Sequence, residues 1–480
     1  MPLPKVNYLY MGPELVLTAA ALLLILVDLY FWRGRNRRLA VFGVLALLAA
    51  AAMTIPLFGV RGATLSKVMV VDPFALFFKL VILAAAAMVI VLSADYIAKH
   101  KLASVGEYYA ILLFATIGMM FMAATTDLIM IYIGLELTSI SCYILAGYHK
   151  TDPKSNEAVL KYFLLGLIAS ALMLYGFSFI YGFTGQTELS RIANALAGQK
   201  GQLAVAAGVL FSLAGFAFKV ASVPFHQWVP DVYEGAPTPV TAFLSVGPKA
   251  AAFAALARIL FIGFPTFAST WKILFIVMAI ASMFIGNLLA IPQTNIKRML
   301  AYSSIAHAGY ILVGFAVASE AAMAGVLLYI AIYVLMNIGA FAIVLAVAHE
   351  PGSGDEVSNF SGLAKRAPFL AITMTVFMVA LAGMPPTAGL WGKFYIFKAA
   401  VEKGLWWLAL LGLLNSVISL YYYANVIRHM YFLEPSSEQP LVTPAAFKGI
   451  VWVTVLAVLI IGFIPQPLIW LSIISARGFG

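Results

Sequence analysis

The chain is divided along its length into about fourteen apolar runs, each long enough to cross a lipid bilayer. A spanning helix needs about 20 apolar residues. The bilayer core offers no water to the backbone, so runs of this length must fold as helices. We therefore predict an all-α integral membrane protein with about 14 transmembrane helices. The runs lie near 14–31, 39–60, 73–95, 107–124, 127–147, 158–182, 203–225, 240–264, 271–291, 300–318, 322–348, 368–401, 405–430 and 447–472.

Composition supports a single polytopic membrane domain over residues 1–480. Of these residues 63% are hydrophobic and only 10% are charged, whereas soluble domains carry roughly 25% charged residues. The net charge of +10 does not indicate nucleic acid binding, because basic residues of membrane proteins gather first in the loops that stay inside the cell.

Several kinds of redox or metal site are excluded by the sequence. The single cysteine, Cys142, excludes an internal disulfide, and an iron–sulfur cluster normally needs about four thiolates. No G-x-G-x-x-G occurs, so nothing indicates a dinucleotide fold. The histidines have no metal-ligand spacing. We therefore expect no cofactor and no metal in this chain.

Two of the apolar runs are interrupted by proline. The seventh is broken at Pro224, and the twelfth at Pro385 and Pro386. Proline removes a helix donor and clashes with the preceding turn. A break at membrane depth is tolerated only where protein or a water-filled cavity satisfies the freed backbone groups. Broken helices of this kind are typical of ion pathways in transporters.

A short similarity between the broken runs indicates an internal repeat. Each carries an A-G-x-x-x-K pattern, at 214–219 and at 388–393. The two runs are five spans apart, and an odd number of spans inverts the second copy. We predict a first repeat at 107–264, a second at 271–430, and flanking helices at 14–95 and 447–472. Chance similarity in apolar sequence remains the alternative.

Loop charges predict the orientation. One set of loops holds fourteen Lys and Arg residues and the opposite set holds eight. The positive-inside rule places the richer set in the cytoplasm. Both termini are then expected on the other, periplasmic side.

Seven basic residues remain inside the spans, each costing roughly 2.5–3.5 kcal/mol at a helix centre. Four have structural explanations. Lys79 lies near the start of its span, where it can extend to the surface, and Lys398 can pair with Glu402 one turn on. Arg258 can reach the interface or cap a loop. Lys161 either pairs near the surface with a carboxylate one turn before it or takes part in ion transfer.

The other three, with the one acid well inside a span, indicate proton transfer. Lys219 and Lys393 border the two breaks, Lys249 lies about nine residues into its span, and Glu136 is the acid. Burial favours a neutral lysine and a nearby carboxylate favours a charged one. A carboxylate that moves would therefore switch the proton affinity of a lysine. The expected partner of Lys219 is Glu136.

Two histidines are further candidates, since histidine exchanges protons near neutral pH. His226, in the first break, could link Lys219 to Lys249. His307, in the tenth run, could pass protons, and a satisfied core histidine is the equal alternative.

Longer motifs carry a family resemblance over essentially the whole chain. KVASVPFHQWVPDVYEGAPTPVTAF, NIKRMLAYSSIAHAGY and GMPPTAGLWGKFYIF closely resemble the antiporter-like subunits of proton-pumping NADH:quinone oxidoreductase, respiratory complex I. GEYYAILLFATIGMMFMA and IYIGLELTSISCYILAGY support this. The resemblance implies fourteen transmembrane helices in two inverted five-helix repeats, with helices seven and twelve broken.

The resemblance also assigns roles. It implies that Glu136 and Lys219 form an acid–lysine pair, that Lys249 is the central relay and that Lys393 lies nearer the exit. Lys161 matches a lysine of the family's sixth helix. A lysine at 393 fits the N-type members, because the M-type places a glutamate there. Gly247-Pro248 departs from the small or polar residues that the family usually has before this lysine. A proline there is expected to distort the helical turn that directs the Lys249 side chain.

The implied function is proton translocation without redox chemistry in this chain. NADH, flavin, iron–sulfur clusters and quinone would belong to partner subunits of the complex, which include a neighbouring antiporter-like subunit, in a bacterial cytoplasmic membrane. Two alternatives are a subunit of a multi-subunit Na+/H+ antiporter or membrane-bound hydrogenase, and a structural scaffold whose lysines serve only docking.

Overall fold

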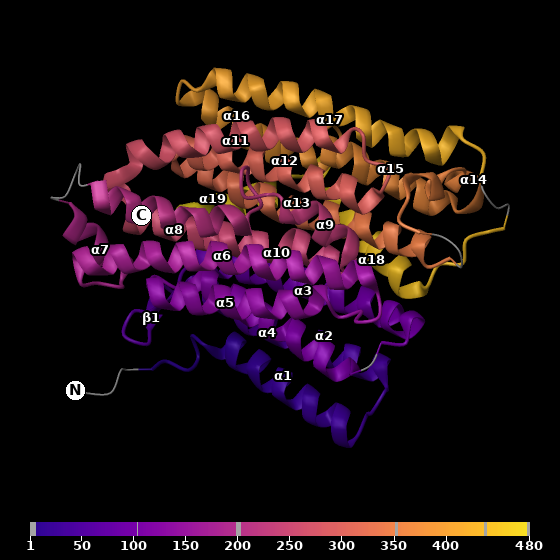
Figure 1. Ribbon diagram of the computed structural model, residues 1–480, viewed down its shortest axis with the longest axis horizontal. Helices are drawn as coiled ribbons and strands as arrows, with labels where there is room; N and C mark the ends of the chain where they lie inside the picture. The colour runs from indigo at the N-terminus through magenta and orange to yellow at the C-terminus, as the bar shows by residue number, and fades with distance from the viewer. Residues whose placement is uncertain (1–5, 103, 198–202, 351–353, 436–438, 478–480) are drawn as a thin grey trace.

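The computed structural model describes residues 6–102, 104–197, 203–350, 354–435 and 439–477. Its long helices lie side by side along one direction (Figure 1). The first half holds α1 (Gly12–Tyr30), α2 (Asn36–Thr54), η1 (Ile55–Gly59), α3 (Pro73–His100), α4 (Val105–Ala124), α5 (Leu128–Ala146), α6 (Pro153–Thr184), α7 (Leu189–Leu196), α8 (Leu203–Lys219) and α9 (Trp228–Gly235). A small antiparallel hairpin joins α2 to α3 and consists of β1 (Gly62–Thr64) and β2 (Met69–Val71).

The second half continues the same arrangement. It holds α10 (Thr238–Arg258), η2 (Ile259–Gly263), η3 (Pro265–Phe267), α11 (Ala268–Ala290), α12 (Ile296–Val317), α13 (Glu320–Ala348), η4 (Val357–Phe360), α14 (Leu363–Arg366), α15 (Pro368–Ala382), α16 (Ala388–Glu402), α17 (Trp406–Phe432), α18 (Ala445–Phe463) and α19 (Gln466–Ala476). Within the described ranges, 12 helices are long and apolar enough to cross a membrane, and α8, α15 and α19 are shorter apolar helices.

Every predicted apolar run coincides with helix, and both predicted breaks are confirmed. The seventh run ends as α8 at Lys219, and α9 begins at Trp228 beyond Pro224. The twelfth run divides into α15 and α16 around Pro385 and Pro386. The fourteenth run was wrongly expected to be continuous, because α18 ends at Phe463 and α19 starts after Pro465. The exact number of spans and the inverted repeats stay predictions.

Short polar side chains determine where several helices begin. The Asp72 carboxylate accepts from the Ala75 amide at 2.7 Å at the start of α3, and Asp127 accepts from Ile129 and Met130 at the start of α5. A side-chain oxygen at this position satisfies an amide that has no partner within the helix. These caps mark the first turns of α3 and α5.

Glycines allow the helices to approach closely. A Cβ added at Gly118 of α4 would lie 2.6 Å from the Gly134 carbonyl oxygen of α5, and one added at Gly286 of α11 would lie 2.6 Å from the Ala306 amide nitrogen of α12. Small residues at such contacts are typical of membrane helix packing. Nearly every side chain of α10, α12 and α13 is buried, so these helices form the centre of the molecule.

Three basic residues inside spans have carboxylate partners. Lys398 lies 3.7 Å from Glu402, as expected. Arg258 donates to the Ala123 carbonyl at 2.8 Å and binds Asp72 through both carboxylate oxygens, which agrees with a loop-capping role. Lys79 was wrongly expected to extend to the surface.

Lys79 forms a buried ion pair. Its side chain is 0% exposed, and its Nζ lies 2.6 Å from Oε1 of Glu14, which is 1% exposed. The two residues are 65 positions apart, so local sequence does not reveal the pair. A partnered charge of opposite sign is the condition under which burial of a lysine is tolerated.

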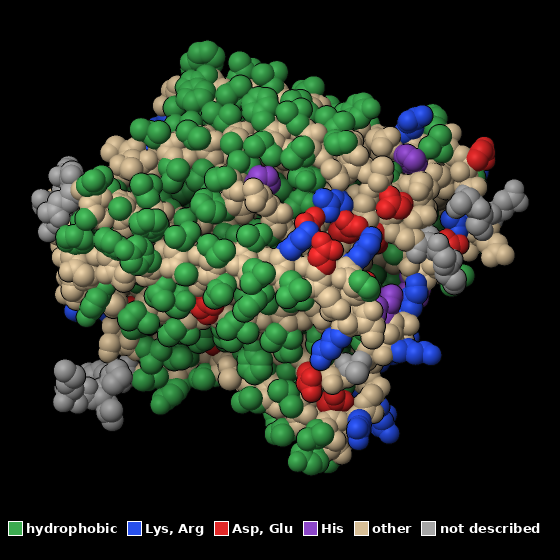
Figure 2. Space-filling model, viewed as in Figure 1, with side chains coloured by type: hydrophobic (Ala, Val, Ile, Leu, Met, Phe, Trp, Pro, Cys, Tyr) green, Lys and Arg blue, Asp and Glu red, His purple; other side chains and the backbone are tan. Residues whose placement is uncertain are grey.

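Charged side chains gather at one end of the molecule, and the orientation in the membrane stays a prediction. On the face seen in Figure 2, Lys and Arg side chains gather toward the right, and hydrophobic side chains cover the broad region beside them. Exposed Leu, Ile, Phe and Trp residues on α1, α2, α6 and α17 are consistent with contact to lipid or to other membrane subunits.

The Glu14–Lys79 pair generates a stability prediction. Lys79→Met leaves a buried carboxylate without its partner, which typically costs about 3–5 kcal/mol. We expect a lower thermal unfolding midpoint for the subunit in its purified complex. The double variant Glu14→Gln, Lys79→Met removes both charges and should recover most of the loss. A single variant as stable as the parent would contradict the pairing.

Candidate functional site

Lys219 is the last residue of α8 and lies directly before the first break. The following amides bond back into the last turn, with Val220 donating to the Phe216 carbonyl at 2.9 Å. The Lys219 side chain is buried, and its ammonium lies 5.2 Å from the centre of the Tyr143 ring and 5.6 Å from that of Tyr162. Aromatic faces attract a cation electrostatically, so these two rings contribute to holding the ammonium of Lys219 in place.

Glu136 lies on the neighbouring helix α5 and is half-buried. Its carboxylate accepts a hydrogen bond from the Ser170 hydroxyl of α6, and Tyr132 Oη lies 3.2 Å from the same hydroxyl. Among the described residues no ion pair within 4.0 Å joins Glu136 to Lys219. The direct pair therefore stays a prediction, and the sequence analysis missed Ser170.

Lys249 reaches across the centre of the molecule from α10 to α12. Its Nζ donates to the Ser304 carbonyl at 2.9 Å and to the Ser304 hydroxyl. That hydroxyl lies 3.4 Å from Tyr233 Oη of α9. Helix α10 continues through Pro248, and Lys249 still points at a polar group in the core.

His307 lies one turn beyond Ser304 on α12 and is fully enclosed. Its Nδ1 is 2.6 Å from Tyr329 Oη of α13, and its Nε2 is 3.2 Å from Tyr423 Oη of α17. Tyr423 Oη in turn lies 2.5 Å from the Ser303 hydroxyl. Hydroxyls both donate and accept, so this chain is compatible with proton transfer and with a satisfied core histidine.

Lys393 donates hydrogen bonds to oxygen atoms at the second helix break. Its Nζ donates to the carbonyl of Ala382, the last residue of α15, at 2.8 Å, and to the Ser416 hydroxyl at 3.1 Å. The same ammonium lies 4.6 Å from the centre of the Tyr310 ring of α12. The lysine therefore replaces a helix donor at the point where Pro385 and Pro386 interrupt the backbone ladder.

Helix α12 connects the lysines of the second half. Ser304 contacts Lys249, Tyr310 contacts Lys393, and His307 lies between them. Positions three apart share one face of a helix, so these three side chains form a polar stripe inside a buried helix. The stripe could have been found in AYSSIAHAGY from this spacing.

Lys161 lies outside this chain of contacts. Its side chain is 43% exposed and its Nζ lies 2.7 Å from Glu157 and 2.6 Å from Asp231. The pairing alternative therefore describes its geometry, and a role in proton transfer stays a prediction.

His226 is half-buried in the first break. No described contact joins it to Lys219 or Lys249, and its Nδ1 has no hydrogen-bond partner among the described residues. The predicted link through His226 is therefore not seen in the geometry.

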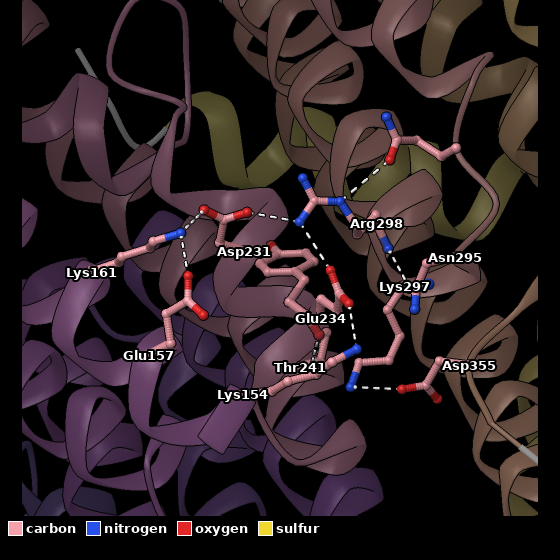
Figure 3. A network of polar contacts seen from close by, with 12 residues as sticks. Lys154, Glu157, Lys161, Asp231, Glu234, Thr241, Asn295, Lys297, Arg298 and Asp355 are labelled. Atoms are coloured by element: carbon pink, nitrogen blue, oxygen red, sulfur yellow. Dashed lines mark hydrogen bonds and ion pairs between the residues drawn. The ribbon is translucent and has the colours of Figure 1, made fainter. Parts of the chain in front are cut away.

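An ion network at one end of the molecule holds α9 in place (Figure 3). Arg298 of α12 donates to Asp231 at 2.7 Å and to Glu234 at 3.0 Å, while Lys161 binds Asp231 and Lys154 binds Glu234 at 2.9 Å. The network thus joins α6 and α12 through α9. The sequence analysis did not pair these residues, because they come from three distant segments.

The network shifts the titration of its two carboxyl groups. Partial burial opposes ionisation of both, but hydrogen bonds from Lys161 and Arg298 hold the pKa of Asp231 below its usual value. Bonds from Lys154 and Arg298 do the same for the pKa of Glu234. Both carboxylates are therefore charged at neutral pH, and the network is complete there.

Within the described ranges, no group of three or more His, Cys, Asp or Glu side chains could hold a metal ion. The buried ionisable groups instead include the lysines and the histidine described above, and their role in proton transfer stays a prediction.

Comparisons with known proteins agree on one family. The model of the NADH:quinone oxidoreductase/Mrp antiporter transmembrane family matches residues 125–419. The NADH-quinone oxidoreductase subunit N of Trichlorobacter lovleyi is 46% identical over 436 residues, which is 90% of this chain and 89% of that protein. The subunit N of Paramagnetospirillum magneticum is 42% identical over 462 residues, with 95% of each covered.

Solved structures share the fold. A chain of respiratory complex I from Thermus thermophilus has a TM-score of 0.79 at 31% identity, covering 95% of this chain and 98% of that one. A chain of an archaeal membrane-bound sulfane sulfur reductase has a TM-score of 0.90 at 24% identity and covers 98% of both. The latter supports the fold alone.

The ion network predicts how firmly α9 is held. Arg298→Gln removes two contacts between partly exposed groups, each worth roughly 0–1 kcal/mol. We expect amide exchange in residues 228–235 to become a few-fold faster at pH 7. The two carboxyl groups have lowered pKa values in the folded state, so their contribution is present above the usual range and lost as pH falls through the lowered values. The difference between parent and variant should therefore vanish on acidification, and a difference that persists would contradict the assignment.

Proposed function

Since this chain belongs to the NADH:quinone oxidoreductase/Mrp antiporter transmembrane family, we propose that it is the N-type, proton-translocating membrane subunit of a NADH:quinone oxidoreductase. The observation that carries the proton path is the buried polar stripe of α12, on which Ser304 contacts Lys249, Tyr310 contacts Lys393 and His307 lies between them. The stripe lies within a core that is mostly apolar. Ionisable residues inside membrane spans are retained for function far more often than for stability.

Protonation of Lys219 starts the cycle in this proposal. Glu136 controls the proton affinity of Lys219 through its charge, since a carboxylate nearby favours the ammonium form and burial opposes it. The half-buried Glu136 lies beside the face of α5 that carries exposed Ile133 and Ile140. A charge change in a neighbouring subunit at this face would alter the pull of Glu136 on the proton.

The proton then passes to Lys249, whose ammonium rests on neutral oxygens of Ser304. Transfer along α12 uses the hydroxyl of Tyr423 and the ring of His307, and it ends at Lys393. Each site gains one proton and releases one, so no electron moves in this chain. Release to the outer side follows when the neighbouring subunit changes its charge state.

Redox chemistry belongs to partner subunits in this proposal. NADH, flavin, iron–sulfur clusters and quinone are bound there, and this chain holds no cofactor or metal of its own. Its partners are the other membrane subunits of the complex, including a neighbouring antiporter-like subunit. The chain is a multi-pass protein, and we place it in a bacterial cytoplasmic membrane with both termini on the periplasmic side.

Two other functions make different predictions. A Na+/H+ antiporter or membrane-bound hydrogenase subunit shares the fold, and the chains that co-purify with this one would identify it. A scaffold without its own ion path predicts that neutral substitution of Lys219 weakens assembly while pumping per electron is unchanged.

Lys219→Ala tests the central step. We expect proton pumping and coupled quinone reduction in membrane vesicles to fall by roughly tenfold or more, because a buried carrier is lost, while a native gel shows the intact complex. Lys403→Ala, an exposed lysine after α16, is the control and should pump normally. Normal pumping by Lys219→Ala would contradict the proposal and favour the scaffold alternative. If that variant fails to assemble, Lys219→Arg is measured in the same way.

Tyr423→Phe tests the contact between Ser303 and His307. Loss of the hydroxyl removes two of the described contacts, so we expect pumping to slow by roughly severalfold with the complex assembled. Tyr421→Phe removes a tyrosine hydroxyl from the exposed side of the same helix and should not change the pumping rate. Equal rates for both variants would show that protons do not use this hydroxyl.

A further inference from the structure

Two histidines unused by the polar chain lie together at the end of the molecule that the loop charges predict to be cytoplasmic. His100 is the last residue of α3, and His149 follows α5. Their ring centres are 5.4 Å apart, and the Tyr96 ring stacks 4.2 Å from His100. Both imidazoles are half-buried. They come from separate segments, so their approach is a feature of the fold and not of local sequence.

The histidine pair lies between two cavities. The smaller, of about 200 Å³, also contacts His349 and Lys297. The larger, of about 570 Å³, lies among α4, α5 and the start of α6. Its rim includes the exposed residues Lys101 and Lys150, so it is open to solvent at this end, and it is large and polar enough there to hold several waters.

The larger cavity leads toward Lys219. Its inner lining includes Tyr143, which is buried on α5, and the ammonium of Lys219 lies 5.2 Å from the centre of the same ring. The same aromatic side chain therefore contacts both the cavity and the lysine at the first break.

We infer that this cavity, lined by His100 and His149, is the cytoplasmic entrance through which protons reach Lys219. This inference rests on the proposed function and adds the supply route that it leaves open. Neutral imidazole accepts a proton at one ring nitrogen and releases one from the other, and histidine does this near physiological pH. The proton crosses the cavity water to Tyr143 and is accepted by the neutral amine of Lys219.

The groups around the pair set the pH at which it works. Facing His100 are Tyr96, Lys99, His149, His349 and Asp152. His149 Nδ1 lies 4.0 Å from Asp152 Oδ2. Beyond them, Lys154, Glu234, Lys297 and Asp355 line the smaller cavity, and Lys101, Glu107 and Lys150 line the larger. Lys154 and Lys297 are already paired with carboxylates.

The test uses the assembled complex in inside-out membrane vesicles. The double variant His100→Gln, His149→Gln should slow NADH-driven proton uptake by roughly threefold or more at about pH 8, where protons are scarce and a carrier matters most. The effect should shrink at about pH 6.5, and added imidazole buffer should restore the rate. His429→Gln, in contact with Ser361 at the same end and outside both cavities, should change nothing.

A second variant keeps both imidazoles and narrows the cavity. Ile144→Trp, at an exposed lining position, should slow proton uptake at high pH and should not respond to imidazole. It also keeps the inference testable if the double variant fails to assemble.

The outcomes separate this inference from the proposed function. One outcome is that proton uptake is unchanged in the double variant and in Ile144→Trp but is lost in Lys219→Ala. This outcome would contradict the proposed entrance and would still support the proposed path through the lysines. Slowing that is equal at all pH values and is not restored by imidazole would show a structural role for the histidines and would also overturn the entrance.

Discussion

The core of this protein depends on how each buried cation is balanced. Lys79 and Arg258 face carboxylates, with Glu14 at 2.6 Å and Asp72 at 2.9 Å. Lys249 and Lys393 instead rest on carbonyl and hydroxyl oxygens. Removing the charge of Lys79 would leave an unpaired buried carboxylate, which is costly. Lys249 and Lys393 have no carboxylate among their described contacts, so the same penalty does not apply to them. The outer pairs therefore hold helices together, and the inner lysines are the proton carriers of the proposed mechanism.

The sequence predicts the helices and breaks well, because both follow from local rules. Apolar length gives the spans, and Pro224, Pro385 and Pro386 interrupt them wherever the rest of the chain lies. Pro465 obeys the same rule, and its break could have been predicted. Partners across the fold could not. Lys79 was expected to extend to the surface because it lies near the start of its span, and its partner Glu14 is distant in sequence. Asp231 likewise had no partner visible in the sequence, because its partners come from α6 and α12.

The sequence predicted the residues of the candidate site better than it predicted their hydrogen-bond partners. Lys219, Lys249, Lys393 and His307 are all buried, as expected from their positions in apolar runs. The hydroxyls that contact Lys249 and His307, from Ser304, Tyr329 and Tyr423, belong to ordinary residues of membrane helices, and only the fold brings them together. His226 differs from these, since it lies half-buried in the first break and has no described contact with Lys219 or Lys249, so its predicted role as a link stays a prediction.

The glycine contacts have a consequence for how ions cross this protein. Gly118 and Gly286 allow backbones to touch so closely that even one methyl group would collide with the facing helix. Helices that touch at that distance would have to break these contacts in order to slide or rock past one another. Carriers that alternate between inward-open and outward-open shapes need such movement. In the proposed mechanism no such movement is required, because protons pass between side chains and water while the glycine contacts stay closed.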